Sequence, residues 1–234
     1  MVCNTGVGLT PTVDGEVHHF STRGIFNGLS MLGDEETETI WNHITGRAVY
    51  GPLKGSVLPV FNLLHVTAEQ ALERYPGLPV AISDRPVRGR RGMFAPIADR
   101  IPFLRDGFRS TIVKEDTRLG TMDIGLGIWT DSEQRYYPME VVQAGGGAIV
   151  DVFDGRRLVV YVEPGIYGLD AFFTEEQTAS TDGTLVTVGE DSVLENGVLR
   201  DSSGERIGIT RPLQLFSRWY GFALTFPETT IYGR

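Results

Sequence analysis

Five residues of this 234-residue chain could take part in chemistry: Cys3, Trp41, His43, His65 and Asp170. A thiolate is a nucleophile and a soft-metal ligand, and an imidazole can act as a base or bind zinc or copper. Cys3 is therefore a candidate catalytic nucleophile or ligand, and His43 a candidate base or ligand. Trp41, His65 and Asp170 are candidate binding residues, with His65 as an orienting partner.

Each candidate also has a structural interpretation. Cys3 is the single cysteine, which excludes an internal disulfide and a four-cysteine zinc site, and a free cysteine often fills a buried apolar position. The histidines show no H-x-E or H-E-x-x-H spacing, so a structural role for each of them is favoured over metal binding. The metal is left open, with copper and zinc as the candidates that suit a thiolate with imidazoles.

Two further groups attract attention because they are polar and clustered. His18 and His19 are adjacent in a strand-like run, so we expect their side chains to face opposite ways, one of them toward solvent. The acidic run GDEETE at 33–38 is typical of a solvated loop, because a calcium site needs spaced ligands around a glycine turn. The glycine-rich stretches 125–129 and 144–151 lack the spacing of a nucleotide-binding loop.

The elements that must position these residues are mostly short strands. Asp-Gly pairs at 14–15, 154–155 and 182–183 precede strand-like runs and predict hairpins. Strands at 121–129 and 136–142 are expected to form one hairpin, and 147–162 the next.

Two segments predict helices. In 67–76, Thr67 and Gln70 fit a capping box and Pro76 ends the helix. In 216–227, Ser217 can cap a helix whose aromatic residues recur at helical spacing, which is more typical of a core face than of a ligand site.

The two helical segments end alike, and the hairpins before them also correspond, which indicates an internal duplication. We therefore predict three parts: a first β repeat at 1–81, connecting hairpins with an arginine-rich crossing segment at 82–156, and a second, degenerate β repeat at 157–234. The predicted fold class is mainly β (a β-rich α+β fold). The two related halves would each end near a short helix and pack about a pseudo-twofold axis as one compact unit.

Charge and composition narrow the possible partners. The formal net charge is −9, which disfavours nucleic acid as a partner. Segment 85–109 nevertheless holds seven arginines, so we expect it to pair with acidic surface, either in a homo-oligomer or on a protein partner. No stretch approaches the roughly 20 apolar residues of a membrane span. The start MVCNTG lacks a signal peptide and is consistent with a trimmed N-terminus, which leaves the compartment open.

The densest motif is WNHITGRAVYGPLKG at 41–55. Thr45-Gly46 and Gly51-Pro52 predict two turns that bracket a short strand at 47–50, which is a structural role. Trp41 and His43 occur in the first half only, so the duplication does not account for them.

These residues are also where a family resemblance lies. The pattern VCNTG…VDG…F…G…W-x-x-x-TG-x-A-x-x-GPL-x-G…YP resembles the bacterial and archaeal family called domain of unknown function 3179. The later RYYPMEVV and RWYGFALTFPETTIY segments are similar to that family as well. Fuller members carry Cys-x-x-Cys-Gly where this chain has Cys3-Asn4-Thr5-Gly6, so a dithiol or two-thiolate site does not carry over. The resemblance implies architecture rather than a reaction.

Two functional hypotheses follow. The first is a binding or assembly module, in which the duplicated sheets form a rigid scaffold and the arginine-rich segment holds a neighbour. The second is a thiol- or transition-metal-dependent enzyme with its site around Cys3, Trp41, His43 and His65. We favour the first, because no acid/base or nucleophile arrangement has a recognisable spacing.

Overall fold

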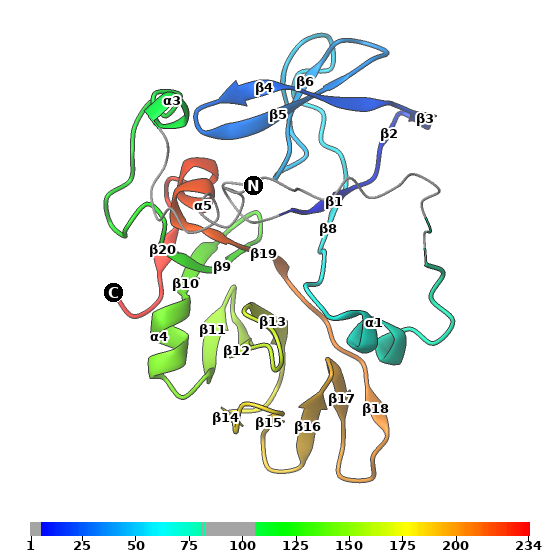
Figure 1. Cartoon of the computed structure of the whole chain (residues 1–234), viewed down its shortest axis with the longest axis vertical. Coiled ribbons are helices and arrows are strands. Elements are labelled where there is room, and N and C mark those ends of the chain that lie inside the picture. The colour runs from blue at the N-terminus through cyan, green and yellow to red at the C-terminus, as the bar shows by residue number, and fades with distance from the viewer. Residues whose placement is uncertain (1–5, 81, 83–105) are drawn as a thin grey trace, which may run out of the picture.

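The computed structural model describes residues 6–80, 82 and 106–234, and its strands form several small sheets arranged along the long axis of the molecule (Figure 1). Helices in this part of the chain are few and short. The predicted mainly β fold class is therefore confirmed. The duplication, its pseudo-twofold axis and the three-part division stay predictions.

The first sheet is built from N-terminal strands in the antiparallel order β4-β5-β6-β7. Its strands are β4 (Phe20–Phe26), β5 (Leu29–Asp34), β6 (Ile40–Asn42) and β7 (Ala48–Tyr50). Asn27 and Gly28 join β4 to β5 with φ of 48° and 71°, as a two-residue type I′ turn requires. Two short pairs flank the sheet: β1 (Gly8–Leu9) with β8 (Val60–Phe61), and β2 (Thr12–Val13) with β3 (Glu16–Val17).

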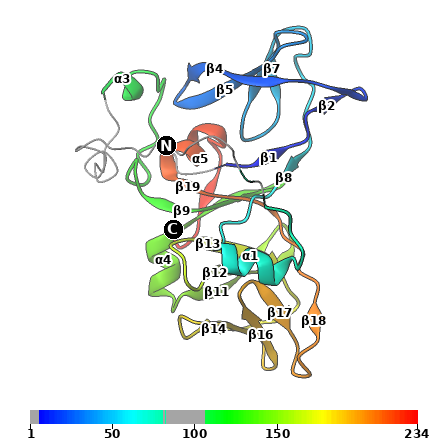
Figure 2. The same cartoon turned by 45° about the vertical axis from the view of Figure 1, so that its right-hand side comes forward.

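The central sheet joins the middle of the chain to its end. Its order is β19 (Leu213–Arg218), β9 (Ile124–Trp129), β10 (Gln134–Pro138) and β20 (Thr230–Ile231), and only the β10–β20 pair is parallel. Helix α5 (Trp219–Thr225) lies against this sheet (Figures 1 and 2). Trp219 and Phe222 of α5 pack there against the buried Tyr136 of β10.

Two further sheets form the lower part of the molecule in Figure 1. The three-stranded sheet contains β11 (Ala148–Phe153), β12 (Arg156–Val162) and β13 (Leu169–Phe173). The five-stranded sheet contains β14 (Ala179–Thr181), β15 (Val186–Val188), β16 (Ser192–Glu195), β17 (Val198–Arg200) and β18 (Arg206–Ile207). Both sheets contribute to one apolar cluster, in which Tyr161 and Phe172 contact Val186 and Val188.

Both predicted helices are present. Helix α1 (Ala68–Arg74) begins with the predicted capping box, in which the Thr67 side chain accepts from Gln70 N and the Gln70 side chain accepts from Thr67 N. Helix α5 differs at its start, because its N-cap is Arg218 and no side chain caps it. The prediction that Ser217 caps this helix is wrong, because Ser217 is still paired with Gly125 in the central sheet.

The predicted hairpins at 121–142 and 147–162 are present, with one local error. The second strand of the first hairpin ends at Pro138, and residues predicted as strand form helix α4 (Met139–Ala144) instead. Met139 and Val142 lie three residues apart, so a helix buries both in the core cluster that also holds Leu158.

The arginine-rich segment 85–109 falls largely outside the described residues. Its last four residues form the short helix α3 (Asp106–Arg109), and Arg109 pairs with Glu115 at 2.8 Å. Among the helices of the described residues, none combines the length and the apolar character that crossing a membrane requires.

Candidate functional site

Trp41 belongs to the core of the first sheet. It is fully buried, meets the ring of Phe20 edge-on, and donates from Nε1 to Asp34 Oδ2 at 2.7 Å. Asp34 ends β5 and is itself fully buried, so the prediction of a solvated acidic run is wrong for this residue. Burial tends to raise the Asp34 pKa, but hydrogen bonds from Trp41 and Thr37 outweigh it and lower the pKa below the ordinary value.

His43 bridges two strands of the same sheet. It follows β6, and its Nδ1 lies 2.7 Å from the Ser30 carbonyl oxygen of β5. Because a carbonyl can only accept, Nδ1 carries the proton in this contact. Burial lowers the His43 pKa, against the smaller opposing effect of the Ser30 carbonyl. Cys3 lies outside the described residues, so its pairing with His43 stays a prediction.

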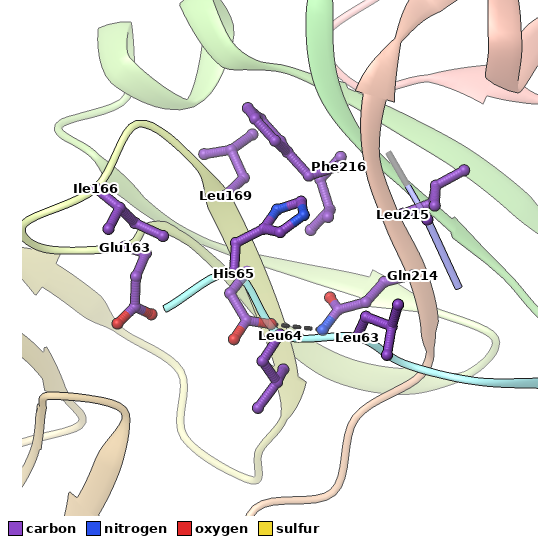
Figure 3. Close-up of a pocket in the computed structure, with 12 residues that line it drawn as sticks. Leu63, Leu64, His65, Glu163, Ile166, Leu169, Gln214, Leu215 and Phe216 are labelled. Atoms are coloured by element: carbon purple, nitrogen blue, oxygen red, sulfur yellow. Dashed lines mark hydrogen bonds between the residues drawn. The ribbon is translucent and has the colours of Figure 1, made fainter. Parts of the chain in front are cut away.

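His65 and Asp170, by contrast, line one small cavity with Gly6. Figure 3 shows His65 in this cavity, beside Leu169 and Phe216. Asn62 ties the segment before His65 to the β19 region, donating to Pro212 O at 2.7 Å and accepting from Gln214 N at 2.9 Å. The cavity measures about 20 Å³, which is room for a water molecule but not for an organic ligand.

Asp170 is the centre of a polar network in the second half of the chain. Tyr161 donates to its Oδ2 at 3.2 Å and Gln214 to its Oδ1 at 2.5 Å. Arg211 adds a charged contact, with Nη2 3.2 Å from Oδ2. Although burial opposes the charge on Arg211, its pKa is raised because Asp170 lies so close.

A second ion pair connects this region to helix α1. Arg74, in the last turn of α1, lies 2.9 Å from Glu163 Oε1 through Nη2 and donates from Nε to the Asn196 carbonyl at 2.8 Å. Gln70, one turn earlier, donates to Pro164 O at 3.1 Å. Burial raises the pKa of Glu163, and the charge of Arg74 only partly offsets it.

Three of the polar side chains around Asp170 and Glu163 have a buried atom without a hydrogen-bond partner among the described residues. Arg74 Nη1, Glu163 Oε2 and Gln214 Oε1 are buried and find no hydrogen-bond partner within the described part of the chain. An unused buried donor or acceptor costs about 1–3 kcal/mol. An ordered water or an ion can complete such a set, and Glu163 and Gln214 line the water-sized cavity beside His65.

A larger hollow opens beside α1 and the last strands of the five-stranded sheet. It has a volume of about 340 Å³ and is lined by Arg74, Arg206 and Arg211, with Tyr75, Ile207 and Ile209 forming apolar wall. We call it the arginine groove. Arg206 is exposed, and its Nη2 donates to the Glu73 carbonyl at 3.0 Å, which holds its guanidinium beside the end of α1.

Another hollow, of about 470 Å³, lies between α5 and residues 113–118. Its one arginine, Arg118, already has partners within the protein. Arg118 binds Asp116 through Nη2 at 2.7 Å and donates to the Thr229 and Pro227 carbonyls at 2.7 and 3.0 Å. Arg118 therefore differs from Arg74 of the arginine groove, whose Nη1 has no partner among the described residues.

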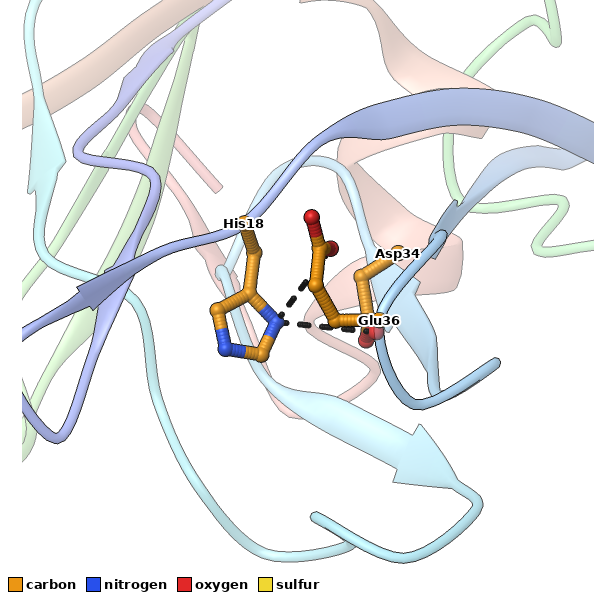
Figure 4. A group of neighbouring side chains, drawn as sticks. All are labelled: His18, Asp34 and Glu36. Carbon is orange, nitrogen blue, oxygen red and sulfur yellow. Dashed lines mark ion pairs between the residues drawn. The ribbon is translucent and has the colours of Figure 1, made fainter.

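One group of side chains outside the arginine groove has the residue types of a metal site. His18, Asp34 and Glu36 each place one ligand-type atom within 4.8 Å of the others (Figure 4). His18 is buried and His19 is exposed, as expected, but neither lies within a strand and both Nδ1 atoms approach Glu36.

Of the five predicted site residues, the structure brings together His65 and Asp170. Trp41 and His43 lie in the first sheet, where their described contacts are structural. The arginine groove was missed because its residues come from positions 74, 206 and 211, with no short spacing to reveal them. The only available signal was that nearly all basic residues of the chain are arginine.

Comparison with known proteins supports the architecture and assigns no activity. The family model described as "Protein of unknown function (DUF3179)" matches residues 1–221. Neither a curated protein nor a solved structure matches the chain. Because the family match spans nearly the whole sequence and agrees with the motifs around Trp41, the chain belongs to the DUF3179 family.

Proposed function

We propose that this protein is a binding module whose arginine groove holds a small organic anion. The observation that carries the proposal is the convergence of Arg74, Arg206 and Arg211 on one 340 Å³ hollow, together with the buried, unused Nη1 of Arg74. Guanidinium groups bind carboxylate and phosphate oxygens through paired hydrogen bonds, so their convergence favours such a ligand.

The charge of the arginine groove favours binding of an anion, although the chain as a whole is acidic. Glu163 and Asp170 pair with Arg74 and Arg211, which leaves Arg206 as the third cation, and the recorded bond of its side chain is to a backbone carbonyl. The groove is thus positive within a chain of net charge −9. An anion that reaches it would meet donors already held in place, which reduces the entropy lost on binding.

The walls favour an organic anion over a bare inorganic ion. Tyr75, Ile207 and Ile209 give the groove an apolar side, and its volume lies in the lower part of the range of small-ligand sites. We therefore assign the guanidiniums to the charged group of the ligand and the apolar wall to its carbon skeleton.

Phenyl phosphate and benzoate test this assignment, with inorganic phosphate and benzyl alcohol as partial probes. We expect two-dimensional NMR titration to show both aromatic anions shifting amides of α1 and β18, with each partial probe binding at least about fivefold more weakly. Replacing Arg206 by Gln removes one charge-assisted donor and should weaken phenyl phosphate by about tenfold.

Arg157→Gln is the matched control, because Arg157 is an exposed arginine of β12 that does not line the groove. It makes the same charge change and should leave the affinity within about twofold. If both variants weakened phenyl phosphate binding equally, the effect would come from long-range charge, and the proposal that the arginine groove is the binding site would be refuted. Shifts mapping to other strands would refute it as well.

A further inference from the structure

We propose that His18, Asp34 and Glu36, which we call the His18 group, bind one Zn²⁺ ion. This site lies beside the first sheet and shares no residue with the arginine groove. Its residues come from the segment between β3 and β4, the end of β5 and the turn that follows β5 (Figure 4).

The geometry of His18 is the first argument. His18 is 8% exposed, and its buried Nδ1 makes no hydrogen bond with any described residue. That atom lies 3.5 Å from Asp34 Oδ1 and 3.7 Å from Glu36 Oε2. A buried polar atom that faces two carboxylates without a bond to either is costly unless a cation joins them.

The distances between His18 Nδ1 and the two carboxylates distinguish a shared metal ion from a hydrogen bond. A protonated histidine that bonds a carboxylate brings its nitrogen to about 2.7–2.9 Å from the oxygen. Tetrahedral zinc, with bonds of about 2.0–2.2 Å, holds its ligand atoms about 3.3–3.6 Å apart. The measured separations of 3.5 and 3.7 Å are close to the zinc value and well beyond the hydrogen-bond value.

Neighbouring hydrogen-bond donors fix the carboxylates of Asp34 and Glu36 in place. Outer-shell groups fix the ligands of a metal ion in the same way. Asp34 accepts from Trp41 Nε1 at 2.7 Å and from Thr37 N and Oγ1 at 2.6 and 2.8 Å. Glu36 accepts from His19 Nδ1 at 2.7 Å and from His19 N at 3.0 Å. These bonds fix the carboxylates before any ion arrives, and such partners normally strengthen metal binding.

The donor set points to the ion. One imidazole with two carboxylates suits zinc, and three protein ligands leave a fourth position for water. Glu36 is 34% exposed in its side chain whereas Asp34 is fully buried, so that fourth position would face the Glu36 side of the group. This assignment also explains Trp41 of the 41–55 motif as the residue that orients Asp34.

Zinc titration of the full chain, stripped with a chelator, tests the proposal. We expect isothermal calorimetry with zinc chloride to show one ion per chain, and His18→Gln to weaken binding at least about 100-fold, since even the loss of an outer-shell partner costs 10- to 100-fold. Glu36→Gln, at a partly exposed position, should weaken it as well and guards against a His18 variant that fails to fold.

Two matched controls keep the test sharp. His65→Gln changes an exposed histidine outside the His18 group and should leave zinc affinity within about threefold. Cys3→Ser should have no effect, which separates this site from the predicted thiolate site. Stoichiometric binding that survives His18→Gln, or that is lost in His65→Gln or Cys3→Ser instead, would overturn the proposal, as would no binding at all.

Discussion

At the scale of single residues, the Trp41–Asp34 bond shows how one side chain can look functional in the sequence and act through another in the structure. The indole N–H is a donor only, and the carboxylate beside it is fully buried. A buried charge needs such donors, because its desolvation is not otherwise compensated. Trp41 therefore first serves to keep a buried carboxylate ionised and oriented.

Replacing Trp41 by Phe should destabilise the fold by about 2–4 kcal/mol. The substitution keeps an aromatic ring in the core but removes a hydrogen bond to a charged group, worth about 1.5–3 kcal/mol, and leaves a smaller ring in the space of the indole. Urea unfolding checks this. Tyr50→Phe on the neighbouring strand is the control, because Tyr50 is 72% exposed and its change should cost under about 0.5 kcal/mol.

His43 makes a prediction about pH. Its folded-state pKa is lowered by burial below the ordinary value of about 6.5. The unfolded chain therefore binds the proton more readily, and the stability due to neutral His43 is present above pH 6.5 and lost as the pH falls below it. The difference in unfolding free energy between wild type and His43→Gln should shrink from pH 7.5 to pH 5. A constant difference would contradict the prediction.

At the scale of elements, sequence reasoning succeeded where the signal is local. The Asp-Gly turns and the Thr67 capping box each depend on a few adjacent residues, and they form as expected. It failed where tertiary packing decides. Residues 139–142 were predicted as strand, yet they lie in helix α4, and the core takes both Met139 and Val142 from one helical face. Local patterns cannot show that competition.

The turn between β16 and β17 shows how elements dock. Gly197 has a φ of 71°, and a Cβ there would lie 1.6 Å from Arg74 Nη2, so the end of α1 packs directly on this glycine. Gly155, in the β11–β12 turn, has the same φ of 71° with open space around it. The two positions share their backbone strain and differ in the contact with α1.

Alanine substitutions at these two glycines should therefore separate strain from docking. Gly155→Ala should cost about 1–2 kcal/mol, the price of a left-handed conformation. Gly197→Ala should cost about 1–3 kcal/mol more, because Arg74 must move. It should also weaken phenyl phosphate binding, which Gly155→Ala should not. Equal costs in urea unfolding would show that α1 does not press on this turn.

At the scale of the whole molecule, the arginine groove depends on contacts that no local pattern predicts. Arg74 and Glu163 are 89 residues apart, and Gln214 and Asp170 are 44 apart. Of this network, the sequence pointed to Asp170 alone. The family match and the fold class were accessible because they rest on motifs and composition, whereas the site arises from how distant segments meet.

The buried Arg74–Glu163 pair leads to the last prediction, in which stability and binding move in opposite directions. Their side chains are 5% and 2% exposed, so Glu163→Gln leaves a buried guanidinium without its counter-charge and should destabilise by about 3 kcal/mol. Arg74→Met combined with Glu163→Leu should be less destabilised, because no buried charge is left unpaired. Glu163→Gln should, however, bind phenyl phosphate more tightly than wild type, because Arg74 is then released to the anion. If the single variant weakened both stability and binding, the pair would be holding the groove in shape rather than competing with its ligand.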